Sequence, residues 1–326
     1  MVPGTLASSS TRATRGPARG SRPGPVALLG QVSETRYWAY VLLLPSLVLV
    51  ATVIVYPVAS GIWLSLHEFN LLRAKLGMRF VGLRQFSELF ADPDTHTILR
   101  NTAVWVTVGA ATQFLLGLVT ALALNRKTLR WSPLARVLIL LPWVIPSVVA
   151  AHMWALLLDA RLGVVNDILV RLDLIGGPRA WLAEPGTAMP AVLLVDLWRG
   201  FPFFTLLLYA GLQTIPEELH EAADLDGASP WQQFRRVTLP LLTPVIVAAV
   251  ILRVISLVNS PDLMIVLTNG GPGLSTFVIS LLAFQTAYEG FNFGAAAAVS
   301  VVMLIALMIF TLLYLRFSGV TRADSP

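Results

Sequence analysis

The sequence predicts an all-α integral membrane protein with six transmembrane helices, and its composition is the first evidence. Hydrophobic residues make up 56% of the 326 residues and charged residues only 13%, with a mean hydropathy of +0.74. Soluble domains are about 45–50% apolar and about 25% charged. The composition therefore excludes a soluble enzyme with one compact core and a disordered protein. The absence of cysteine excludes a disulfide-stapled domain, thiol catalysis and cysteine-ligated metal sites.

The second observation is the number of long apolar stretches. A spanning helix needs roughly 20 mostly apolar residues, because about 30 Å of hydrocarbon is crossed at about 1.5 Å per residue. Six stretches meet this requirement: residues 39–66, 101–124, 137–158, 187–211, 241–257 and 291–315. A further apolar stretch, 263–288, is interrupted by Asn-Gly-Gly-Pro-Gly at 269–273. We expect a turn there, followed by a short re-entrant or interfacial helix over 274–288.

The third observation is the distribution of lysine and arginine, which predicts how the chain is oriented in the membrane. Five arginines lie in residues 1–36, and the loop after the second stretch is also basic, whereas the loop after the fifth has no basic residue. Basic loops stay on the cytoplasmic side, so both termini are expected inside. Residues 1–36 are expected to be a disordered basic tail, 37–318 the transmembrane domain with its core over about 95–318, and 319–326 a cytoplasmic tail. A transit peptide is the alternative for the first segment, but its Pro and Gly content disfavours an amphipathic presequence.

Residues 214–244 differ from an ordinary connecting loop. Two helices are expected here, because Thr214 with Glu217 and Ser229 with Gln232 have the spacing of capping boxes. Gly227 lies where a left-handed residue would end the first helix. That helix has a small-residue face and carries acidic side chains suited to a basic partner: Glu217, Glu218, Glu221, Asp224 and Asp226. A solvated hairpin on the membrane surface is the alternative, although anionic lipid does not favour an acidic helix.

Three charged residues lie within the apolar stretches. An ionised group at the bilayer centre costs about 2.5–3.5 kcal/mol on insertion scales, so such groups usually face a bundle interior or a wet cavity. Asp196 and Arg199 are three residues apart on one helix face, where they can pair, and Arg253 stands alone in the fifth stretch. These residues therefore either line a cargo path or, as an Asp196–Arg199 ion pair, only hold helices together.

The acidic segment also carries a family resemblance. Glu221-Ala222-Ala223, followed by Gly227 and Leu239-Pro240, resembles the EAA loop of ABC importer permeases, here residues 214–244. Leu-Thr-Asn-Gly-Gly-Pro at 267–272 resembles a segment of the maltose-type, carbohydrate-uptake permeases. Three more patterns fit that group, at residues 80–83, 141–147 and 198–203. The resemblance covers residues 37–318.

The resemblance implies the type I ABC importer permease fold, with six transmembrane helices, both termini inside and a cytoplasmic coupling helix. That helix would dock in a groove of a cytoplasmic ATPase, where Glu221 would pair with a basic residue. The coupling residues implied are Glu217, Glu218, Glu221, Ala222, Ala223, Asp224 and Gly227. Implied partners are a second homologous permease, two ATPase subunits, an extracytoplasmic sugar-binding protein and the lipid of a prokaryotic inner membrane, with no nucleic acid.

The resemblance also places the cargo contacts on the third, fourth and fifth apolar stretches. They fall on Trp143, Ser147, Asp196, Arg199, Gly200, Phe203, Arg253 and Leu257. An aromatic face suits the apolar side of a sugar ring, while Asp, Arg and Ser bond its hydroxyls. The chain departs from the family pattern at five of these positions: Trp143, Asp196, Phe203, Arg253 and Leu257. The cargo therefore need not be maltose, and Trp143 alternatively packs helices or lies at the membrane interface.

No catalytic or metal-binding constellation is present in the sequence. The four histidines lack metal-ligand spacing, and no Gly-x-x-x-x-Gly-Lys-Ser/Thr motif occurs. We therefore expect no cofactor on this chain, with ATP and Mg²⁺ bound by the partner ATPase. One rival hypothesis is an ion-driven secondary transporter that uses Asp196, and another is a permease for glycerol-phosphate-type cargo that meets Arg199 and Arg253. The acidic EAA loop, which a secondary carrier does not need, favours an importer driven by partner ATPases. The resemblance implies that its cargo is a sugar or a related polyol or glycoside, moved inward by alternating access.

Overall fold

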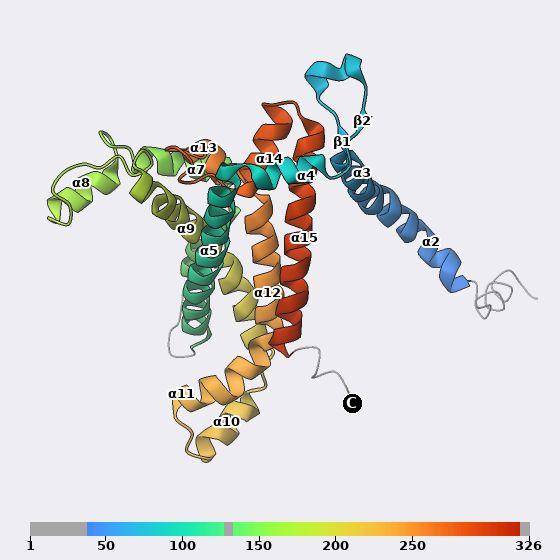
Figure 1. Ribbon diagram of the computed structural model, residues 1–326. Helices are drawn as coiled ribbons and strands as arrows, with labels where there is room; N and C mark the ends of the chain where they lie inside the picture. Colours follow the sequence, from blue (N-terminus) through green and yellow to red (C-terminus); the bar gives the residue numbers. More distant parts are fainter. Residues whose placement is uncertain (1–37, 127–132, 320–326) are drawn as a thin grey trace, which may run out of the picture. The chain divides into compact units, whose positions relative to one another are not determined.

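The computed structural model describes residues 38–126 and 133–319 of the chain (Figure 1). The regular secondary structure of these residues is helical, apart from one small two-stranded ribbon. The chain divides into two units, Met1–Val58 and Ala59–Pro326. The predictions for residues 1–36 and for all but the first residue of 319–326 lie outside the described residues.

The first predicted span is one continuous helical stretch. It comprises α2 (Trp38–Val50), the π-helical turn η1 (Ala51–Val55) and α3 (Tyr56–Ser65), which crosses the boundary between the two units. Leu42–Ser65 within it is long and apolar enough to cross a membrane, and none of its most apolar window is buried. A helix that is apolar all round is typical of a membrane span, as predicted for residues 39–66.

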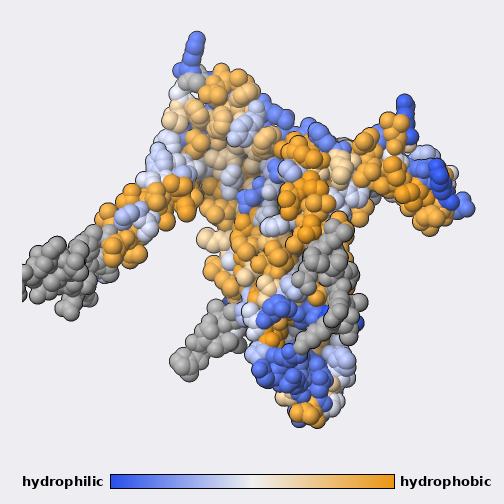
Figure 2. Space-filling model, turned by 180° about the vertical axis from the view of Figure 1, so that it is seen from behind, coloured by the Kyte–Doolittle hydropathy of each residue, from blue (hydrophilic) through white to orange (hydrophobic). Residues whose placement is uncertain are grey.

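Four further long helices belong to the second unit. They are α5 (Pro93–Asn125), α9 (Pro185–Leu212), α12 (Leu239–Asn259) and α15 (Phe293–Ser318). All four form part of candidate membrane spans, which confirms the second, fourth, fifth and sixth predicted spans. The most extensive packing is between α5 and α9, while α12 packs against α5, α9 and α15. Figure 2 shows apolar residues dominating the surface along the long helices.

The third predicted span is not one continuous helix. Residues 137–158 divide into α6 (Pro133–Val144) and α7 (Ser147–Leu157), which meet at a bend of 102°. The break falls at Pro146, which has no N–H to donate and disfavours helical backbone in the residue before it. The described residues therefore hold five spans, or six if the bent pair counts as one.

A structured turn joins α7 to α8 (Val164–Arg171). Asp159 accepts hydrogen bonds from the backbone N–H groups of Leu162 at 2.9 Å and Arg161 at 2.8 Å, which hold the pKa of its carboxyl below the usual value. The buried Asn166 then donates to the carbonyls of Asp159 and Arg179 at 3.0 and 2.9 Å. The segment between α7 and α9, which contains α8, is thus stabilised by hydrogen bonds among its own residues.

The predicted turn at residues 269–273 is confirmed. After α12 the chain forms α13 (Asp262–Leu267), the turn, and then α14 (Ile279–Tyr288), a short apolar helix. Asn269, Gly270 and Gly273 all have positive φ, a conformation that glycine and asparagine adopt at low cost. The short helix begins five residues later than the expected 274.

Shorter elements precede α5 in the second unit. The strands β1 (His67–Glu68) and β2 (Arg79–Phe80) pair antiparallel, with His67 opposite Phe80. Between them lies the 3-10 turn η2 (Leu71–Leu76), and α4 (Arg84–Ala91) follows. An isolated bridge joins Asn70 to Asn292, so this region is hydrogen-bonded to the start of α15.

The acidic segment forms a helical hairpin of α10 (Glu217–Leu225) and α11 (Pro230–Gln233). Gly227 has the predicted left-handed conformation, with φ of +73°, and the N–H of Ala228 donates to the carbonyl of Ala223 at 2.9 Å. This arrangement is a Schellman-type helix end. The Ser229–Gln232 capping box is also confirmed.

Two details of the hairpin differ from the prediction. Pro216, not Thr214, is the N-cap of α10, because the Thr214 hydroxyl instead donates to the carbonyl of Gly211 at 2.8 Å. In addition, α11 is not a separate helix, because it continues through the π-helical turn η3 (Phe234–Thr238) into α12. The result is one helical rod of 30 residues from Pro230 to Asn259.

The core of the second unit includes buried side chains of α5, α9 and α12, together with residues of α7, α13, α14 and α15. The fully buried side chains include Trp105, Phe204 and Leu208. The indole N–H of Trp105 donates to the carbonyl of Leu257 at 3.1 Å, which ties α5 to α12. A β-carbon at Gly117 would overlap Phe204, so a glycine there lets α5 and α9 approach closely.

The left-handed conformation of Gly227 predicts the effect of adding a side chain. Gly227→Ala should destabilise the α10–α11 corner by about 1–2 kcal/mol, because an L-residue in this conformation is strained. Nothing lies within 4 Å of a β-carbon at this position, so the cost is conformational and not steric. Faster amide hydrogen exchange over residues 217–233 would report the change.

Gly186→Ala, in the first turn of α9, is the matched control. Its β-carbon also meets nothing within 4 Å, and its φ is not positive, so this change should leave exchange in the hairpin unaltered. Equal exchange in both variants would contradict a conformational role for Gly227.

Candidate functional site: a buried polar network and an acidic hairpin

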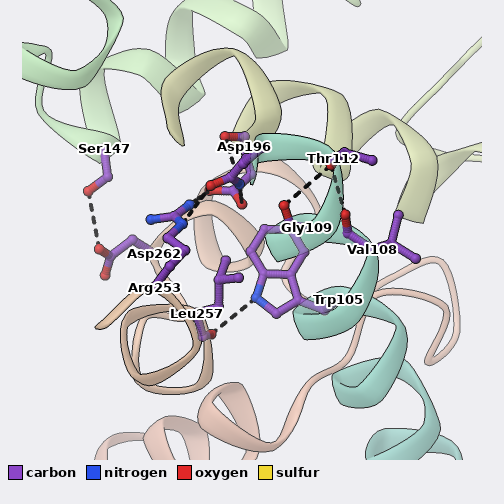
Figure 3. Close-up of polar contacts among 10 residues, drawn as sticks. Trp105, Val108, Gly109, Thr112, Ser147, Asp196, Arg253, Leu257 and Asp262 are labelled. Atoms are coloured by element: carbon purple, nitrogen blue, oxygen red, sulfur yellow. Dashed lines mark hydrogen bonds and ion pairs between the residues drawn. The ribbon is translucent and has the colours of Figure 1, made fainter. Parts of the chain in front are cut away.

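Three polar side chains from three helices form one buried network, of which Figure 3 labels Asp196 and Arg253. The Arg253 guanidinium on α12 donates from Nη2 to Asp196 Oδ1 on α9 at 2.8 Å, and from Nε to Gln113 Oε1 on α5 at 2.6 Å. Gln113 Nε2 in turn donates to Asp196 Oδ2 at 2.5 Å. Only 9% of the Arg253 side chain and 4% of the Asp196 side chain are exposed. The network therefore joins the three central helices through charge-assisted hydrogen bonds.

The geometry differs from the Asp196–Arg199 ion pair, which was one of the two alternatives left open by the sequence. Asp196 pairs with Arg253 on another helix, so Arg253 does not stand alone. A guanidinium offers donors in a fixed planar fork, and Arg253 uses that fork to reach Asp196 and Gln113 together. Arg199 Nε is buried and has no hydrogen-bond partner among the described residues.

Gly200 makes room for this network. A β-carbon at that position would overlap the Gln113 amide and the Arg253 guanidinium. Gly200 was predicted as a cargo contact, but in this conformation its lack of a side chain accommodates two polar groups from neighbouring helices. Any larger residue would displace Gln113 or Arg253 from the buried position.

A small cavity of about 20 Å³ lies beside the network. The Ser147 hydroxyl at the start of α7 donates to Asp262 Oδ2 at the start of α13, at 3.1 Å (Figure 3). The cavity is lined by predicted pathway residues and by residues that neighbour them: Trp105, Ser147, Asp196, Arg199, Arg253, Ser256, Leu257, Ser260, Asp262 and Leu263. A cavity of this volume is about the size that holds one water molecule, so the described conformation is closed to a larger cargo.

The structure brings five of the eight predicted pathway residues to this cavity: Ser147, Asp196, Arg199, Arg253 and Leu257. Trp143 and Phe203 lie elsewhere, with ring centroids 6.4 Å apart, and 45% of Trp143 is exposed. Sequence reasoning did not select Gln113 or Asp262. Gln113 could have been found, because it is the only amide side chain in residues 102–124 of an otherwise apolar stretch.

The acidic hairpin presents most of its predicted coupling residues to solvent. Figure 2 shows hydrophilic residues gathered at the end of the second unit formed by α10 and α11. The exposed residues among those predicted are Glu217, Glu218, Glu221, Ala222, Asp224 and Gly227. Ala223 is half-buried, and Gln233 Nε2 holds Asp224 Oδ1 at 2.5 Å, so these two residues also stabilise the hairpin. Leu225 is 90% exposed at the tip of α10.

Within residues 38–126 and 133–319, no group of three or more His, Asp or Glu side chains is placed to hold a metal ion. Asp196 and Arg253 instead pair with each other, while Arg199 lies beside them with its Nε buried and without a hydrogen-bond partner among the described residues. An all-helical chain with several apolar spans, a buried charge network between them and an acidic hairpin at one end has the features of a multi-pass membrane transport protein.

Comparison with known proteins identifies the family. Residues 113–320 match the profile of the binding-protein-dependent transport system inner membrane components, and the chain belongs to this family. The trehalose/maltose transport system permease protein MalF of Thermococcus litoralis is 38% identical over 87% of this chain and 94% of its own. The trehalose transport system permease protein SugA of Mycobacterium tuberculosis is 31% identical over 89% and 91%. The sulfoquinovosyl glycerol transport system permease protein SmoG of Agrobacterium fabrum is 36% identical over 86% and 90%.

Solved structures show the same fold. A bacterial ABC transporter involved in the import of the acidic polysaccharide alginate matches with a TM-score of 0.73 at 22% identity, over 92% of this chain and 99% of that one. The family confirms the predicted permease fold class and the multi-pass inner membrane location. The chain is a component of a binding-protein-dependent ABC system and not an enzyme, and the family has no cofactor of its own.

The network predicts a difference between single and paired substitutions. Arg253→Met should lower the free energy of unfolding by about 3–5 kcal/mol, because it leaves the Asp196 carboxylate buried without its cation. The double variant Asp196→Leu, Arg253→Met should recover much of this loss, because no uncompensated charge remains. Denaturant unfolding in detergent micelles would measure both.

Arg171→Met is the matched control, because Arg171 pairs with Asp167 at 2.9 Å in an ion pair that is 76% and 56% exposed. Loss of an exposed pair should cost less than about 1 kcal/mol. Similar destabilisation by the two single arginine substitutions would rule out a special role for burial of the network.

Proposed function

We propose that this chain is a permease subunit of an ABC importer for a sugar or a related polyol or glycoside. It would work with a second homologous permease, two cytoplasmic ATPase subunits and an extracytoplasmic sugar-binding protein. The names of three relatives, which refer to trehalose, maltose and sulfoquinovosyl glycerol, support the cargo class. A transporter for alginate is also solved with its pentasaccharide-bound periplasmic protein, at a TM-score of 0.71. The observation that carries the proposal is an exposed acidic hairpin built directly onto α12, the helix of Arg253.

The hairpin provides a short mechanical link to the spans. An ATPase docked on α10 would push Glu221 and its neighbours when the ATPases close. The rod from Pro230 to Asn259 carries this movement to Arg253, about 35 Å away at about 1.5 Å per residue. Asp196 lies on α9, which ends at Leu212, five residues before α10 begins at Glu217. Both arms of the hairpin therefore lead to helices that carry the buried network. Movement of these helices would open the cavity beside the network alternately to the two sides of the membrane.

Cargo would enter where α7, α9, α12 and α13 meet. Asp196 and Arg253 satisfy each other in the closed state, so Arg199 and Ser147 are better placed for sugar hydroxyls once the cavity widens. Arg199 Nε already lies buried beside the cavity without a hydrogen-bond partner among the described residues. Trp143 and Phe203 would add aromatic faces for the apolar side of a sugar ring.

A phosphate-bearing cargo has weaker support. Two arginines could clamp a phosphate, but Arg253 is already bonded to Asp196 and Gln113. A phosphate would then meet Arg199 without the second cation, and with Asp262 also lining the cavity. The neutral or weakly charged sugar therefore remains the better candidate.

Docking of the hairpin on an ATPase predicts that Glu221→Lys uncouples transport. Uptake of labelled sugar by the complete transporter should fall by more than about tenfold, because reversing a charge at an interfacial pair costs several kcal/mol. Membrane insertion should be unchanged, since Glu221 is exposed. Glu184→Lys, an exposed residue at the opposite end of α9, should leave uptake intact. Wild-type uptake by Glu221→Lys would refute the docking role.

The energy source separates this proposal from a secondary transporter that uses Asp196. Depleting cellular ATP should stop uptake, whereas an uncoupler that collapses ion gradients should leave initial uptake largely intact. Short time courses are needed, because uncouplers later deplete ATP as well. Uptake that stops with the uncoupler while ATP remains high would instead favour the ion-driven mechanism.

A further inference from the structure

A second cavity, of about 860 Å³, lies at the hairpin end of the second unit. It is formed by the ends of α5 and α9 on one side and by α10, α11 and η3 on the other. None of the proposed cargo-pathway residues lines it. Its volume falls within the roughly 300–1,000 Å³ that is typical of small-molecule sites. Of the coupling residues named above, Glu217 alone lines this groove.

One wall of the groove is an aromatic platform. Trp231 lines the groove with 67% of its surface exposed, and its ring stacks on Phe234 at a centroid distance of 5.5 Å and an interplanar angle of 28°. The stack fixes the orientation of the Trp231 ring and leaves much of its surface accessible. The apolar floor comes from Leu122, Leu212 and Ile215.

Side chains that donate and accept hydrogen bonds line the same groove. Gln213 Nε2 donates to Asn125 Oδ1 at 2.5 Å, which orients both amides at the ends of α9 and α5. Within residues 38–126 and 133–319, no other hydrogen bond involves the Gln213 side-chain oxygen or the Asn125 side-chain nitrogen, so both atoms can meet a ligand. The half-buried His220 adds an imidazole from α10. An accessible aromatic face beside oriented amides and an imidazole matches a sugar ring, which is apolar on one side and carries hydroxyls around its edge.

The groove and the proposed ATPase-docking surface are adjacent on α10 and share Glu217. Glu217 and His220 line the groove and are one turn apart. Glu218, Ala222 and Leu225 are exposed and recur at the same helical spacing on another face. A ligand in the groove would contact the hairpin and the spans together, and would thus bias their relative position if it binds one position better than the other.

We propose that this groove is a second carbohydrate site, which takes the transported sugar from the cytoplasmic side and slows the transport cycle. The inference rests on the proposed function, which supplies both the sugar and the cytoplasmic orientation of the hairpin. The site is lined by Trp231, His220, Gln213 and Asn125. Sugar that accumulates inside would hold the hairpin against α5 and α9 and thereby reduce ATP-driven movement.

The test uses the complete transporter in vesicles with its ATPases facing the outside solution. Binding protein and trehalose are enclosed in the lumen, and ATP hydrolysis is measured as trehalose is added outside, with betaine as the osmotic control. Hydrolysis should fall as outside trehalose rises. Trp231→Ala should raise the half-inhibitory concentration by about tenfold, equivalent to about 1.4 kcal/mol. Trp231→Phe should restore inhibition, because it keeps an aromatic face.

Trp63→Ala, which removes an exposed tryptophan far along the chain from the groove, is the matched control and should be inhibited like the wild type. If Trp231→Ala does not assemble, Gln213→Ala serves in its place, with the same expected loss of inhibition. Wild-type hydrolysis that responds to lumenal but not to outside trehalose would overturn the site and leave the proposed function intact. Unchanged inhibition in the groove variants would also overturn it. If lumenal trehalose and a panel of other lumenal sugars all fail to stimulate hydrolysis, the proposed function itself fails.

Discussion

The need to compensate charge inside the membrane controls the arrangement of the central helices. A lone aspartate or arginine at this depth is costly, and removing one partner from a buried pair costs more than the pair contributes. Asp196, Arg253 and Gln113 solve this problem together, because each finds its partners on the other two helices. The relative positions of α5, α9 and α12 are therefore tied to one set of hydrogen bonds, and Gly200 leaves the space for them.

The sequence predicted the membrane spans better than it predicted which side chains pair inside the protein. Apolar length is a local property, so the helices α5, α9, α12 and α15 could be located from composition and length alone. The partner of Asp196 is not local: Arg253 is 57 residues away and Gln113 is 83 residues away. The spacing rule for neighbours on one helix allowed a pair with Arg199, but tertiary packing selected Arg253.

Local sequence patterns were also less reliable where two patterns predicted different structures for the same residues. The apolar run at residues 137–158 favoured one span, yet Pro146 divides it into two helices at 102°. At the hairpin, Gly227 and the Ser229 capping box followed the local rules, whereas Thr214 bonded the preceding helix and left Pro216 as the cap of α10. Local hydrogen-bonding rules state which bonds are possible, and the surrounding helices decide which of them form.

The π-helical turn η3 (Phe234–Thr238) between the hairpin and α12 has a consequence for the whole rod. A π turn holds one residue more than the regular helix accommodates, and each residue of an α-helix rotates the following face by about 100°. The turn therefore takes up one residue while the angular phase between the hairpin and Arg253 stays almost the same. Deleting one residue here would restore regular helix and leave the guanidinium facing Asp196, whereas a deletion in the regular helix between this turn and Arg253 would rotate the guanidinium by about 100°. Loss of a residue should therefore be tolerated better at this turn than in the regular part of the rod.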